Sequence, residues 1–253
     1  MHIPAKHAER SMRAMRTLIR QNPLGFLTTG LSHPDYPFLQ SSHIPFILIA
    51  PEDESSTELG VLRAHMARAN PQAKAMIASA KMDPSSGTYA LEQEVLVLFT
   101  ADPHGYVSPS WYTETKPATG KVVPTWDYCA VQVYGKATIF ADAADERTSE
   151  YLQGQMEALT ELSEASVGKT GDGAWKVSDA PERYIELHKK AVVGVEIRID
   201  RIEGRSKMSQ DKSPKDVEGV VAGFRSLRTE AGEKMAQGVR RAADEATAAK
   251  AAE

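Results

Sequence analysis

The chain contains about seven runs of β-strand character, most of them joined by short, turn-like segments. The runs cover residues 24–29, 40–50, 59–66, 95–100, 106–108, 131–140 and 192–200, and the last one continues through 201–210. Short connections join antiparallel neighbours, because a parallel pair needs a long crossover. We therefore expect a mainly β protein with peripheral helices (α+β), whose antiparallel sheet closes as a barrel and so removes its exposed edges.

Helical periodicity lies mainly outside these runs. The expected helices cover residues 9–20, 69–80, 144–165, 181–190 and 214–228, and residues 51–57 and 81–92 are expected to be surface loops. The C-terminal residues are almost all Ala, Glu, Lys, Arg and Gln, with little to bury. We expect one domain over residues 1–225, followed by an exposed helical or disordered tail over residues 226–253.

Composition restricts the classes of function. Thirty Lys and Arg against 34 Asp and Glu give a net charge of −4, which does not favour direct DNA binding through a basic surface. A single cysteine, Cys129, excludes an internal disulfide and fits a reducing compartment such as the cytoplasm. The apolar runs are too short for a membrane helix. The basic start is read as a surface helix, with a mitochondrial presequence as the alternative.

One polar segment follows the third strand-like run. On a strand, Arg63 and His65 point to the same face, and Arg68 and Asn70 follow where a helix begins. Planar donors beside a helix N-terminus can hold a phosphate or a carboxylate. The alternative is a solvated polar face with a helix cap.

Two aromatic clusters lie at residues 106–112 and 121–128, each with Ser or Thr and Pro. Trp and Tyr beside hydroxyl groups can flank a flat conjugated ring. A dimer interface or a small aromatic core would explain the same pattern. The seven histidines are scattered, and their spacing indicates no metal site.

Several motifs together resemble one family. They are Met1-His-Ile-Pro, Asn22-Pro-Leu-Gly, His43-Ile-Pro-Phe, His65-Met-Ala-Arg-Ala-Asn-Pro-Gln, Tyr106-Val-Ser-Pro-Ser-Trp-Tyr, Lys121-Val-Val-Pro-Thr-Trp, Val177-Ser-Asp-Ala-Pro and Lys207-Met-Ser-Gln. In this order they resemble the PaiB-type FMN-binding negative transcriptional regulators. The resemblance implies an FMN-binding split β-barrel of the pyridoxamine-phosphate-oxidase type. It also implies a homodimer with flavin at the subunit interface.

The resemblance also implies a set of cofactor-binding residues. They are Ser42, His43, Ile44, Arg63, His65, Arg68, Asn70, Trp111, Tyr112, Lys121, Thr125, Trp126, Lys207 and Gln210. The chain departs from the family at two places, where Asp127 and Asp211 replace the usual Asn. Each change replaces an amide, which donates and accepts, by a carboxylate that only accepts hydrogen bonds.

The expected function is that of a flavin-dependent redox protein or a flavin-responsive regulator, with no catalytic residue assigned. One alternative is a transcriptional regulator that acts through protein partners or DNA. Another is a haem-binding or haem-degrading split barrel, for which His104 and His188 are the candidate ligands.

Overall fold

The structure is a computed structural model of the chain, and it describes residues 1–51, 57–82 and 88–251. These residues form two compact units. The first unit comprises Met1–Leu18, Thr100–Val131 and Glu203–Glu253, and the second comprises Ile19–Phe99 and Gln132–Ile202. The single domain expected over residues 1–225 stays a prediction.

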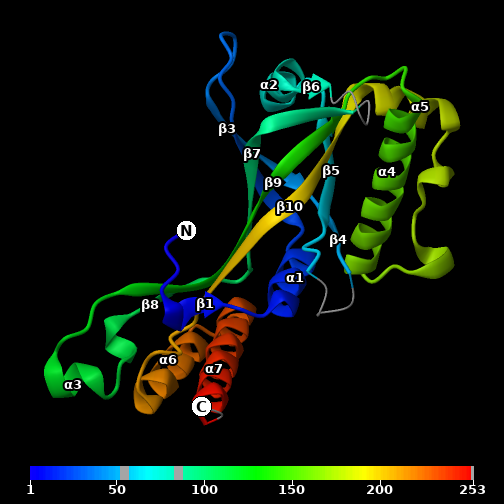
Figure 1. Cartoon of the computed structure of the whole chain (residues 1–253). Helices are drawn as coiled ribbons and strands as arrows, with labels where there is room; N and C mark the ends of the chain where they lie inside the picture. Colours follow the sequence, from blue (N-terminus) through cyan, green and yellow to red (C-terminus); the bar gives the residue numbers. More distant parts are fainter. Residues whose placement is uncertain (52–56, 83–87, 252–253) are drawn as a thin grey trace. The chain divides into compact units, whose positions relative to one another are not determined.

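An antiparallel sheet of ten strands is the main element of the structure (Figure 1). Seven strands follow the order β3-β2-β7-β9-β10-β5-β4, while β1, β6 and β8 pair with β10, β7 and β9. The strands are β1 Ala8–Glu9, β2 Leu24–Gly30, β3 Leu39–Pro45, β4 Ile47–Ile49, β5 Val61–Ala67, β6 Lys81–Met82, β7 Tyr89–Thr100, β8 Gly105–Val107, β9 Thr125–Phe140 and β10 Val192–Lys207. The mainly antiparallel β class with peripheral helices is confirmed.

The expected closure of the sheet is not found in its hydrogen bonding. Among the described residues, the pairings leave the sheet open between β3 and β4. The run expected as one strand over residues 40–50 divides at Phe46, whose N–H donates to the Pro23 carbonyl outside both ladders. Because Pro45 has no N–H to donate, the ladder ends there, and β3 pairs with β2 while β4 pairs with β5.

The helices of the second unit are α2 Pro71–Ser79, α4 Glu146–Ser166 and α5 Glu182–Ala191. Tyr151 of α4 stacks on Phe140 at 4.0 Å, and its hydroxyl donates to the Val195 carbonyl at 2.7 Å. In the core of the second unit, the Phe46 ring packs edge to face on the Phe99 ring, with the ring centres 5.8 Å apart.

The loop expected over residues 81–92 is partly strand. Lys81 and Met82 form β6 and pair with Ala90 and Tyr89 of β7. Residues 83–87, like residues 52–56 of the other expected loop, lie outside the described part of the chain.

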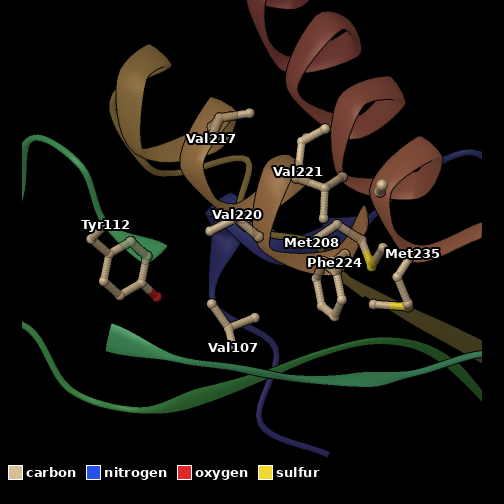
Figure 2. Packing of buried hydrophobic residues seen from close by; sticks show 10 residues of the cluster. Val107, Tyr112, Met208, Val217, Val220, Val221, Phe224 and Met235 are labelled. Atoms are coloured by element: carbon tan, nitrogen blue, oxygen red, sulfur yellow. The ribbon is translucent and has the colours of Figure 1, made fainter. Parts of the chain in front are cut away.

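The first unit contains α3 Thr115–Thr119, α6 Pro214–Ser226 and α7 Glu230–Ala251, while α1 Met12–Gln21 spans the boundary between the units in the sequence. The tail is helical, but the expectation that it is exposed is wrong. Figure 2 shows Met235 of α7 beside Phe224 and Val221 of α6. Met235, Ala236 and Val239 fall on one side of the helix, and this narrow apolar stripe is buried against α6.

Candidate functional site

The predicted cofactor-binding residues divide equally between the two units, and those of the second unit begin on β5. Leu62, Ala64 and Met66 are buried, while Arg63 and His65 occupy the other face, as the sequence alternation predicted. Arg63 donates from Nε to Glu196 at 2.8 Å. Burial lowers the pKa of His65, and its buried Nδ1 makes no hydrogen bond within the described chain.

Arg68 has a structural role that sequence reasoning missed. Its guanidinium donates to the backbone carbonyls of Lys190, Ala141 and Val192, at 3.0, 2.7 and 3.3 Å. These bonds fix the end of β5 to the segments that lie beside it. Arg68 therefore has less donor capacity left for a phosphate than the sequence predicted.

Asn70 is the N-cap of α2, as the sequence indicated. Its Oδ1 accepts from the Gln72 N–H at 2.8 Å, and its Nδ2 donates to the Ser42 hydroxyl at 3.1 Å. The structure thus brings together Ser42 and Asn70, which lie on β3 and at the start of α2. His43 is exposed and lies against the Phe26 ring, whereas Ile44 is buried in the core.

In the first unit, three of the predicted residues have partners of their own. Trp111 packs on Phe224 at 5.1 Å, and Trp126, 47% exposed, donates from Nε1 to His104 Nδ1 at 3.0 Å. Gln210 donates to the Ser206 carbonyl at 2.6 Å and accepts from the Met208 N–H at 2.7 Å. Its amide therefore organises the loop after β10.

The other four, Tyr112, Lys121, Thr125 and Lys207, line one pocket of about 230 Å³. Lys207 donates to the Thr125 hydroxyl at 2.5 Å and to the Trp126 carbonyl at 2.6 Å. The pocket also contains residues that sequence reasoning did not assign to a site. They are Lys6, His7, Thr115, Val122, Val123, Asp127, Ser209, Asp211, Lys212 and Asp216.

Several groups that line this pocket have pKa values that differ from their ordinary ones. Burial raises the pKa of Asp127 to about 6, although the Ser209 hydroxyl and the Lys207 ammonium both oppose the change. Burial also raises the pKa of Tyr112 to about 12 and lowers the pKa of Lys207. The pKa of Asp211 is lowered even though burial acts against it, because Lys6 donates a hydrogen bond and Lys212 lies nearby. The sequence distinguished Asp127 and Asp211 only because each replaces an Asn that is usual in the family that the motifs resemble.

The donors on β5 fit the phosphate of FMN. Arg63 is partly exposed, and His65 carries a buried ring nitrogen with no hydrogen bond in the described chain, so both side chains have donor capacity left. The pocket of the first unit has a volume of about 230 Å³ within one chain, below the roughly 300–1,000 Å³ that drug-sized ligands usually occupy. Among the described residues, no group of three His, Cys, Asp or Glu side chains could hold a metal ion. Nor does any described helix meet the length and hydropathy needed to cross a membrane.

Comparison with known proteins gives relatives along most of the chain. An uncharacterized protein of Emericella nidulans is 51% identical over 243 residues, which are 95% of this chain and 96% of that protein. The protease synthase and sporulation protein PAI 2 of Bacillus subtilis is 29% identical over 155 residues, 61% of this chain and 66% of that protein. Among solved structures, the flavocytochrome Anf3 of Azotobacter vinelandii has a TM-score of 0.44 and 12% identity, covering 81% of this chain and 72% of its own.

A family model described as "Putative FMN-binding domain" matches residues 1–201. This match contains the whole second unit except its last residue, together with the β5 donors and the start of α2. It covers well over half of the chain, and FMN is the cofactor it names. The chain therefore belongs to this family of FMN-binding domains.

Proposed function

We propose that this protein is a flavin-dependent redox protein, in which Arg63 and His65 of β5 hold the FMN phosphate. The observation that carries the proposal is the family match over residues 1–201, which includes these donors. When bound, FMN supplies hydride or single-electron transfer through its isoalloxazine ring. The chain itself contributes binding and orientation.

The arrangement of β5 explains how these side chains would act. The Glu196 carboxylate holds Arg63 at 2.8 Å, and the guanidinium lies 5.4 Å from the centre of the Tyr151 ring. Both contacts fix its position before a ligand arrives, which lowers the entropy lost on binding. Because burial lowers the pKa of His65, the neutral ring offers one donor and one acceptor at neutral pH.

A homodimer and a cytoplasmic location belong to the same proposal. Phe38 and Leu39, where β3 begins, are 59% and 68% exposed, and exposed apolar side chains of this size support contact with a second copy. The single cysteine, Cys129, is free and supports a reducing compartment. Size-exclusion chromatography with light scattering tests the dimer, and a monomer at micromolar concentration would contradict it.

The first experiment is an absorption spectrum of the purified protein, followed by thermal melts with added FMN. We expect flavin bands, and FMN at 100 times its Kd should stabilise the fold by about 2.7 kcal/mol, or about 5–10 °C in Tm. A haem spectrum would instead support the haem alternative. Colourless protein whose Tm FMN does not change would refute flavin binding.

Two matched variants test the phosphate assignment. Arg63→Gln should weaken FMN binding while leaving riboflavin, which lacks the phosphate, almost unaffected. Arg198→Gln is the control, since Arg198 lies on β10 with a side chain 74% exposed. Bleaching of the bound flavin by NADH or NADPH, and its reoxidation by oxygen, would establish the redox role.

A regulatory role is the second candidate, favoured by the name of the Bacillus subtilis relative, a sporulation protein. The net charge of −4 favours action through a protein partner over direct DNA contact. A gel-shift assay with genomic fragments at low salt would detect direct binding, and specific shifts there would promote this candidate.

A further inference from the structure

The pocket of the first unit contains a buried carboxylate that the proposed function does not use. Asp127, on β9, has no exposed surface. Its Oδ2 accepts from the Ser209 hydroxyl at 2.6 Å, while Oδ1 lies 3.7 Å from Lys207 Nζ and accepts no hydrogen bond. A buried carboxylate oxygen without a donor is costly, so a ligand N–H group that reached this atom from the pocket would relieve that cost.

The residue that holds Asp127 is itself strained. Ser209 has a φ of +57°, in the left-handed region that residues with a Cβ rarely adopt. The Ser209 hydroxyl donates to the Asp127 carboxylate from this conformation. Strained backbone of this kind clusters at ligand-binding sites, where the surrounding structure maintains it.

His7 adds two further unsatisfied atoms to the same pocket. It is 5% exposed, and neither ring nitrogen makes a hydrogen bond within the described chain; Nε2 lies 3.7 Å from Asp211 Oδ1. A neutral imidazole carries one donor and one acceptor. A polar ligand group that reached the ring would give it a partner that the described chain does not.

Positive charge surrounds the exposed side of the pocket. Lys121 is exposed, and the side chains of Lys6 and Lys212 are 59% and 37% exposed, whereas Lys207 is largely covered. The pocket contains these four lysines and three aspartates, and Lys6 and Lys212 share Asp211 as their ion-pair partner. Its rim therefore favours an anion, while its floor favours a hydrogen-bond donor.

From this arrangement we propose that the pocket binds a compact zwitterion, with a protonated amine at Asp127 Oδ1 and a phosphate or carboxylate at the lysines. A simple anion would leave Asp127 unsatisfied and be repelled by it, and a simple amine would meet the lysines. The volume of about 230 Å³ suits a compact ligand, since it lies below the roughly 300–1,000 Å³ of sites for drug-sized molecules. Tyr112, Thr125 and Lys207 then contact this ligand and not FMN.

Isothermal titration calorimetry on the full chain tests the proposal. The probes are O-phosphoethanolamine and 4-aminobutyrate, which distinguish a phosphate from a carboxylate, with ethanolamine and inorganic phosphate as half-ligands. We expect at least one zwitterion to bind at least tenfold more tightly than either half-ligand. No heat from either zwitterion at millimolar concentration, or equal affinity for a half-ligand, would overturn the proposal.

Two substitutions locate the binding site. Asp127→Asn should reduce the affinity at least tenfold, and Asp244→Asn, an exposed change on α7, should not alter it. Lys121→Gln changes an exposed side chain without disturbing the core, and should weaken binding severalfold relative to Lys116→Gln on α3. Unchanged affinity in both pocket variants would refute the assignment.

Saturating FMN separates this proposal from the flavin function. We expect the affinity for the zwitterion to stay within twofold when FMN is present. Complete competition would assign the pocket to FMN and overturn the proposal. The assay needs no bound flavin, so a failure of FMN binding leaves the zwitterion site standing.

Discussion

Replacing Asp127 by Asn should remove a pH-dependent weakness of the fold. Burial raises the pKa of this carboxyl from its ordinary value of 3.8 to about 6. A pKa that rises from 3.8 to about 6 corresponds to about 3 kcal/mol, since a tenfold change in proton affinity is roughly 1.4 kcal/mol. Because Asp127 is buried, solvent screening reduces this figure only a little. The attraction of Lys207 is already contained in the shift.

The sign follows from proton binding. The folded protein holds the Asp127 proton more tightly than the unfolded chain, so this group favours folding fully below about pH 4. That contribution is lost as the pH rises through 6. Asn cannot ionise, and its carbonyl oxygen can still accept the hydrogen bond from Ser209.

Urea unfolding at pH 4 and pH 7.5 measures the difference. The unfolding free energy of Asp127→Asn minus that of the original chain should rise by up to about 3 kcal/mol between the two pH values. Asp244→Asn, an exposed change, should show no such rise. If this difference in unfolding free energy stays constant between pH 4 and pH 7.5, the pKa of Asp127 is not raised in the folded protein, and the reasoning is refuted.

Three further changes test the packing. Gly223→Ala places a methyl group against the Trp111 ring and should lower the free energy of unfolding in urea by about 1–3 kcal/mol. Gly154→Ala places its methyl group in open space and should raise that free energy by up to about 1 kcal/mol. Equal effects of the two changes would contradict the contact with Trp111. Arg68→Ala removes the Arg68 hydrogen bonds to three backbone carbonyls and should lower the free energy of unfolding by about 2–4 kcal/mol, measured in the absence of flavin. An unchanged midpoint of urea unfolding would contradict a structural role for Arg68. Val239→Asp buries a charge on α7 and should lower the stability by at least about 3 kcal/mol in thermal melts, whereas an exposed tail would tolerate it.

The segment around β5 shows which structural features the local sequence pattern predicts and which it does not. Alternation along residues 61–67 was enough to predict which side chains are buried and that Arg63 and His65 share a face. The cap at Asn70 was also readable, because its short polar side chain precedes a proline in the first turn. The role of Arg68 was not, since its three carbonyl partners lie 73 to 124 residues away in the sequence.

The tail shows the opposite case. Its composition predicts a helix, and the structure confirms one over Glu230–Ala251. The sequence gives little sign of burial, because Met235, Ala236 and Val239 form a stripe too narrow to indicate a packed helix. Burial depends on α6 offering a matching apolar face, which no property of the tail itself reveals.

By itself, then, the sequence determined the antiparallel β class, most of the helices and the two groups of candidate residues, because these depend on periodicity and on short motifs. Only the tertiary structure decided which of those side chains keep donors free. It also assembled the pocket of the first unit from residues near 7, 127 and 209, because the folded chain alone brings such distant segments together. The buried state of Asp127 is the clearest instance, since a carboxylate acquires a raised pKa only when its neighbours exclude water.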